Sequence, residues 1–155
     1  MRVREVLEAA REAALAIRRN EELAELRRLS IGVQGHSYDV HSKSGILDPT
    51  RKIDDILDWE MEQNEEVPRE AIDEAFDIVA GATHVSDSLT IEVMTRYYLQ
   101  AESYVELVRD LAVDRGLKMF QGLPRREQVA LLSSMIEDAI DKWEHLGIAR
   151  LKDMA

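Results

Sequence analysis

The sequence contains no cysteine and only three prolines and seven glycines among its 155 residues. Without cysteine the chain can form no disulfide, no thiolate zinc site and no cysteine nucleophile, and the absence fits a reducing compartment. So few glycines and prolines are atypical of a β protein with many turns. The sequence also has no apolar run of about 18 residues, and charges interrupt its first apolar stripe. We therefore expect no membrane span, no signal peptide and a cytoplasmic location.

The apolar and charged residues that are present predict helices. Hydrophobic residues make up 45% of the chain and charged residues 33%, which is too apolar for a disordered tail. The length allows one or two compact units. We predict an all-α protein: a helical bundle with a long N-terminal helix, a helical hairpin and a helix-turn-helix-like C-terminal part.

The negative charge is concentrated in the N-terminal part of the chain. The formal net charge is -11. Residues 1–95 hold 11 Lys and Arg against 21 Asp and Glu, a net charge of -10, whereas residues 96–155 hold 9 against 10, a net charge of -1. The N-terminal part should therefore repel nucleic acid, while the C-terminal part can still present a local basic surface.

Residues 1–84 are predicted to form an acidic N-terminal helical region. Apolar residues at three- and four-residue steps predict one amphipathic helix from Val3 to about Leu29. Its narrow stripe suits packing within the chain or pairing with a second copy, so a homodimer through long helices is one expectation. Residues 30–48 carry three of the seven glycines and no helical period, which predicts a loop.

Two further helices are predicted to form a hairpin within this region. One begins at Asp48 and Pro49, because the carboxylate can cap free N–H groups and proline is favoured at the first helical position. The other follows Pro68 and stops at Gly81. The apolar spacing of this helix places Phe76 on its buried face.

Residues 85–155 are predicted to form the C-terminal helical region. A helix opens at Asp87 or Ser88, and the next opens with the capping box of Ser103 and Glu106. The last helix runs from about Pro124 and carries an apolar stripe in heptad spacing, which we expect to contact a second copy or another partner. Tryptophan within such helices is expected to pack, with a subunit contact as one option. The stripe residues are Val129, Leu132, Ile136, Trp143 and Leu146.

The segment 103–115 has a pattern typical of a helix-turn-helix. Such a motif needs a capped first helix with an apolar inner face, then a tight turn at a small residue, then a new N-cap. Ala112 is the small residue, and Asp114 is the new cap. The predicted core of the motif is Ser103, Leu107, Val108, Leu111, Ala112 and Asp114.

Together with the preceding LTIEVMTRYYLQA, this segment resembles region 4 of bacterial sigma factors. It also resembles a family of small phage and prophage proteins, of largely unknown function, whose C-terminal half is sigma-like. About 25 residues match closely and the earlier helices match loosely. The resemblance implies a transcription regulator that acts on double-stranded DNA or on RNA polymerase. The matching residues are Arg96, Tyr97, Ser103 and Tyr104.

The segment that should hold the recognition helix departs from the family pattern. It contains Gly116, Gly122 and Pro124, which are poor choices for a helix that must lie rigidly in a groove. The first turns of the last helix are therefore also candidates for contact with phosphates. The candidate DNA-binding residues are Arg115, Lys118, Arg125 and Arg126.

Two other functions stay open. The first is a non-catalytic helical interaction or scaffold protein without DNA binding, because the recognition segment is broken and the net charge is unfavourable. The second, a minor alternative, is an all-α magnesium-dependent nucleotide pyrophosphohydrolase, a class that holds the ion between paired carboxylates. The pairs with suitable spacing are Glu62 with Glu65, Glu70 with Asp73, and Glu74 with Asp77.

Nothing else in the sequence predicts catalysis. The four histidines have no spacing typical of zinc ligands, and the chain has no glycine-rich phosphate loop. Isolated serines without a partnered histidine and aspartate are no evidence for a nucleophile. We therefore expect no enzyme activity, no metal and no cofactor.

Overall fold

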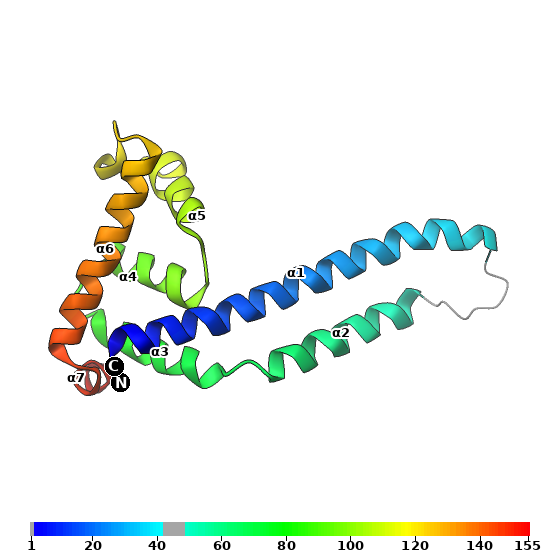
Figure 1. Cartoon of the computed structure of the whole chain (residues 1–155), viewed down its shortest axis with the longest axis horizontal. Helices are drawn as coiled ribbons and strands as arrows, with labels where there is room; N and C mark the ends of the chain where they lie inside the picture. Colours follow the sequence, from blue (N-terminus) through cyan, green and yellow to red (C-terminus); the bar gives the residue numbers. More distant parts are fainter. Residues whose placement is uncertain (1, 42–48) are drawn as a thin grey trace. The chain divides into compact units, whose positions relative to one another are not determined.

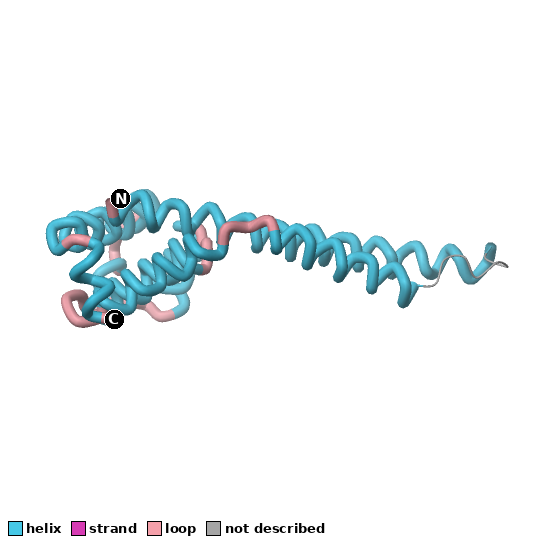
Figure 2. Tube along the Cα trace, turned by 90° about the horizontal axis from the view of Figure 1, so that it is seen from below, coloured by secondary structure: helices cyan, strands magenta, loops and turns pink. Residues whose placement is uncertain are grey.

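The computed structural model describes residues 2–41 and 49–155 (Figure 1). Helices connected by loops make up these residues, and Figure 2 shows no strand among them, which confirms the all-α prediction. No described helix is both long and apolar enough to cross a membrane. The helices are α1 (Val3–His41), α2 (Pro49–Glu65), α3 (Arg69–Ala82), α4 (Ser88–Met94), η1 (Thr95–Leu99), α5 (Tyr104–Val108), η2 (Arg109–Asp114), η3 (Lys118–Phe120), α6 (Arg125–Leu146) and α7 (Ile148–Met154).

The chain divides into two compact units, and the division differs from the predicted one. The first unit holds residues 1–14 and 69–155, and the second holds residues 15–68. The predicted boundary between residues 84 and 85 is wrong, because α3 packs against α7 and therefore belongs with the C-terminal helices. Helix α1 contributes to both units.

The second unit contains a hairpin of α1 and α2, whereas the sequence predicts a hairpin of the second and third helices. Polar side chains connect its two helices, and α3 belongs to the other unit. The contacts are a hydrogen bond from Asn20 to Asn64 at 3.0 Å, an ion pair of Arg28 with Glu60 at 3.0 Å, and the guanidinium of Arg27, which lies 4.0 Å from the centre of the Trp59 ring.

Part of the predicted loop at residues 30–48 is helical. Helix α1 continues to His41 without a break. It passes through two glycines, each of which costs only about 1 kcal/mol in a helix interior, so neither is strong enough to end it. Residues 42–48, which include the predicted cap Asp48, lie outside the described residues.

The first unit has one apolar core. The N-terminal part of α1 and the helices from α3 to α7 contribute side chains to it. Phe76 is 61% exposed, so its predicted burial is wrong. Helix α3 packs through a face of smaller side chains three and four residues apart, and Phe76 lies beside that face. The largest fully buried side chains of the core are Trp143, Phe120, Leu7, Ile78, Met94, Leu107, Leu111, Leu132, Ile136, Ile140 and Leu151.

The heptad stripe of α6 faces this core. Leu132, Ile136 and Trp143 are at most 2% exposed, and Val129 and Leu146 are partly buried against them. The prediction that the stripe contacts a partner is therefore wrong for its three central residues. The reason is that heptad spacing specifies a helix–helix contact and not whether the other helix belongs to the same chain.

Asp87 caps α4 as predicted, and Asp87→Ala should lower the free energy of unfolding by about 1 kcal/mol at neutral pH. Hydrogen bonds from the side chain and the backbone N–H of Thr90 lower the pKa of Asp87 below its ordinary value. Because this pKa is lower in the folded state, the cap stabilises the fold above the unfolded pKa, and the effect disappears as the pH falls through the folded pKa.

Urea denaturation at several pH values measures this contribution. Asp87→Asn is the matched control, because asparagine keeps a capping oxygen but does not titrate. We expect it to match the wild type at neutral pH. A difference between the wild type and Asp87→Ala that stays constant down to about pH 3 contradicts the role given to the carboxylate.

Candidate nucleic-acid interface

The segment predicted as a helix-turn-helix consists of two successive helices of the first unit. The first is α4 continued by η1, and the second is α5 continued by η2. The predicted capping box at the start of α5 is confirmed. The backbone N–H of Glu106 donates to Ser103 Oγ at 3.2 Å, and the backbone N–H of Ser103 donates to the Glu106 carboxylate at 3.4 Å. This cap determines where the second helix begins.

Both helices end in a π turn followed by a residue with positive φ. In the first, the N–H groups of Gln100 and Glu102 donate to the carbonyls of Thr95 and Arg96, and Ala101 between them has a φ of 56°. Glycine adopts this conformation freely, whereas alanine is strained in it. The second helix repeats the pattern with the bonds from Arg115 to Asp110 and from Leu117 to Leu111, and with Gly116 at a φ of 57°.

These helix ends correct two details of the predicted motif. Ala112 lies inside η2, so the turn is at Gly116 and not at Ala112. Asp114 is the last residue of η2 and is exposed, and the 3-10 turn η3 follows instead of a recognition helix that Asp114 would cap. The predicted inner face is confirmed, since Leu107, Val108 and Leu111 are buried.

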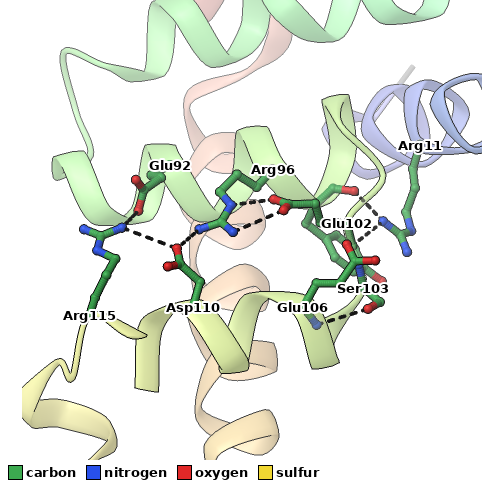
Figure 3. Close-up of polar contacts among 9 residues, drawn as sticks. Arg11, Glu92, Arg96, Glu102, Ser103, Glu106, Asp110 and Arg115 are labelled. Carbon is green, nitrogen blue, oxygen red and sulfur yellow. Dashed lines mark hydrogen bonds and ion pairs between the residues drawn. The ribbon is translucent and has the colours of Figure 1, made fainter. Parts of the chain in front are cut away.

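A network of ion pairs connects the two helices (Figure 3). Arg96 of η1 is largely buried and contacts the carboxylate of Glu102 and, at 2.5 Å, that of Asp110. The hydrogen bond with Glu102, followed by that with Asp110, raises the pKa of Arg96. Arg115 pairs with Glu92 at 2.5 Å and approaches Asp110 at 4.0 Å. The network therefore connects α4 and η1 to the residues before, within and after the second helix.

Arg11 of α1 contacts the segment that joins the two helices. Its guanidinium donates to the backbone carbonyls of Tyr97 and Glu102 and lies 3.8 Å from the centre of the Tyr97 ring. The ring of Tyr97 stacks on that of Tyr104, with ring centres 4.9 Å apart. Internal contacts therefore engage all four residues on which the resemblance depends, namely Arg96, Tyr97, Ser103 and Tyr104.

The segment that joins η2 to α6 is basic. Residues 115–126, which we call the basic loop, contain four cations and no Asp or Glu. Figure 1 shows this segment, coloured yellow to orange, at the N-terminal end of α6. The four cations are the predicted DNA-binding residues Arg115, Lys118, Arg125 and Arg126.

The four cations of the basic loop differ in their surroundings. Arg115 is engaged by Glu92 and Asp110 and therefore has a structural role. The side chains of Lys118, Arg125 and Arg126 are exposed, and the described part of the chain offers them no ion pair or hydrogen bond. These three cations remain available to an anionic partner.

Neither a metal centre nor a known relative identifies the site. The described residues contain no group of three or more histidines and carboxylates that could hold a metal ion. The carboxylate pair Glu62 and Glu65 belongs to the second unit, the pairs of α3 belong to the first, and Glu74 binds Lys152 at 2.9 Å. Comparison with family models, with curated proteins and with solved structures finds no match to this chain.

Proposed function

We propose that the chain is a regulatory protein of the phage or prophage type that binds double-stranded DNA through its basic loop. The observation that carries the proposal is the presence of three exposed, unpaired cations in a segment without carboxylates, within a chain of net charge -11. A concentration of unpaired positive charge is the feature that a phosphate backbone recognises.

The fold supports a rigid presentation of these cations. Phe120 of η3 is fully buried, so the loop is anchored in the core of the first unit. Gln121 donates to the carbonyl of Gly116 at 3.0 Å, and Gln128 donates to that of Phe120 at 3.1 Å. These contacts limit the conformational entropy that the loop would lose on binding.

The absence of an α-helix between η2 and α6 determines the kind of binding that we propose. A recognition helix reads base edges in the major groove, whereas lysine and arginine on a loop chiefly contact phosphates. We therefore expect DNA binding that depends strongly on salt and only weakly on sequence. Selectivity for a promoter would then come from a protein contact, for which RNA polymerase is the candidate implied by the resemblance.

The triple substitution Lys118→Ala, Arg125→Ala and Arg126→Ala should remove most of the salt dependence of DNA binding. If each cation neutralises one phosphate, the slope of log K against log salt decreases by about 2 to 3. Wild-type affinity should decrease by roughly 40-fold between 50 and 200 mM salt, and that of the variant far less. Fluorescence anisotropy with a random-sequence duplex measures both slopes.

The matched control removes the same charge elsewhere in the first unit. Arg2, Arg69 and Arg150 are also exposed, and their triple alanine variant should keep the wild-type slope. If both triple variants lose affinity equally, only net charge matters and the basic loop is not the site. If the wild type does not bind DNA even at low salt, the proposed function is wrong.

A second candidate function is that of a helical interaction protein. The specific observation in its favour is that the hairpin of the second unit exposes large apolar side chains on both helices. Exposed apolar side chains that form one patch are typical of a surface that contacts another protein. This function predicts protein binding with little dependence on salt.

A further inference from the structure

The hairpin of the second unit buries few side chains among the residues whose burial the structure describes. We call residues 15–30 of α1 together with α2 the arm. Among residues 15–30 and 54–65 of the arm, the buried side chains are those of Ala24 and Ile56. Two helical segments that bury so few apolar side chains gain little stability from each other, and burial against a further partner would stabilise them. The apolar side chains that stay 43–63% exposed on the arm are Leu23, Leu26, Leu29, Leu57 and Met61.

The specific contacts between the two helices of the arm are made by other, mostly polar side chains. The helices are connected by hydrogen bonding of Asn20 with Asn64, by the ion pair of Arg28 with Glu60 and by stacking of Arg27 on Trp59. Polar contacts therefore connect the helices beside the buried Ile56, while five large apolar side chains of the arm stay exposed. In a monomeric helical hairpin the apolar stripe usually faces the core, so this many exposed apolar side chains indicate a further contact.

The charges of the two helices indicate which partner fits. Residues 15–30 carry four arginines and three glutamates, whereas α2 carries two cations and six carboxylates. A twofold axis between two copies can place α1 of each beside α2 of the other. Helices of opposite net charge are then neighbours, as in coiled coils whose partners are selected by charge. We infer that two copies of this chain associate through their arms as a four-helix bundle.

The surface area that the two arms would bury against each other is small for a dimer interface. Helix α2 has 17 residues, so it is about 25 Å long, and two helices side by side are about 20 Å wide. Each copy then covers roughly 500 Å², or about 1,000 Å² in total, near the lower limit for a specific dimer. We therefore expect a dissociation constant on the order of 1 to 10 μM.

Sedimentation velocity of the full chain over a concentration series tests the inference. The wild type should be a dimer at about 100 μM and mostly a monomer at about 0.3 μM. Leu26→Glu with Leu29→Glu should be monomeric throughout, because four carboxylates would be buried in the bundle. Leu26→Ala with Leu29→Ala, which keeps helix propensity, should weaken the dimer at least tenfold even if the glutamate variant disturbs the arm.

The control variant adds the same charges to exposed apolar residues of the first unit. Val105→Glu with Val113→Glu should dimerise like the wild type, since these residues lie outside the arm. A wild type that stays monomeric at 100 μM overturns the inference, and so does a dimer that both arm variants leave intact. The result is independent of DNA binding, because no substitution affects the basic loop.

Discussion

Gly81→Ala is expected to lower the free energy of unfolding by at least 3 kcal/mol, a large part of the stability of a small protein. A Cβ atom at Gly81 would lie 1.7 Å from the carbonyl oxygen of Leu151 and 2.6 Å from its carbonyl carbon. Both atoms belong to the backbone of α7, so no rotamer change relieves the overlap. Either α7 moves away from α3 or α3 bends, and each response exposes core side chains. Urea denaturation followed by circular dichroism measures the change.

Gly122→Ala is the matched control for this substitution. Apart from its neighbours in the chain, no atom lies within 4 Å of a Cβ at Gly122, although its φ of 78° makes alanine strained. Its cost should be about 1 kcal/mol, from backbone strain alone. If Gly81→Ala costs no more than the control, the close approach of α3 and α7 is not a feature of the folded protein.

Local signals in the sequence were sufficient to predict where several helices begin. Asp87 and Ser103 cap helices because a short polar side chain can accept a hydrogen bond from the following turn, and this requires no distant residue. The inner face of α5 and η2 could also be predicted, because the three- and four-residue spacing of Leu107, Val108 and Leu111 places them on one side of a helix.

The pairs of helices that pack together could not be predicted, because an apolar stripe does not specify the helix against which it packs. The sequence placed α3 beside α2 from their short connection, but α3 packs on α7, at the far end of the chain. The close approach depends on Gly81, which the sequence suggested only as a helix stop. In the same way, Phe76 has the spacing of a core residue and still lies outside the packed face.

The ion-pair partners in the candidate site could not be predicted from the sequence either. Glu92 and Arg96 are four residues apart, a spacing at which ion pairs on one helix are common. In the structure Arg96 binds Glu102 and Asp110 instead, and Glu92 binds Arg115. These pairs depend on two π turns, and the first of them uses Ala101, a residue whose type gives no sign of positive φ.

The sequence alone shows only in part which cations of the basic loop are free to bind an anionic partner. Four cations without a carboxylate between residues 115 and 126 can be counted in the sequence. That Arg115 is already paired, and that Lys118, Arg125 and Arg126 are not, required the positions of Glu92 and Asp110. The structure therefore reduces the predicted contact set from four residues to three.

Trp143→Ala should destabilise the chain by about 3 to 5 kcal/mol, which distinguishes a core role from a role at a subunit contact. The side chain is fully buried within one chain, and its indole N–H donates to Ser86 Oγ at 2.9 Å. The substitution leaves a large cavity within one chain, so the loss of stability appears at every protein concentration. Trp143→Phe keeps most of the volume and should cost about 1 to 2 kcal/mol.

The concentration dependence of unfolding makes this test decisive. A tryptophan at a subunit contact stabilises the fold only where dimers exist, so its removal would matter at high concentration and not at low. Trp59, which is half-buried on the arm beneath Arg27, is the comparison. Trp59→Ala should cost less than 2 kcal/mol at low concentration, because solvent already reaches the ring. Urea denaturation of both alanine variants at about 0.3 and 100 μM should therefore show a concentration-independent loss for Trp143, and a loss that vanishes on dilution contradicts its place in the core.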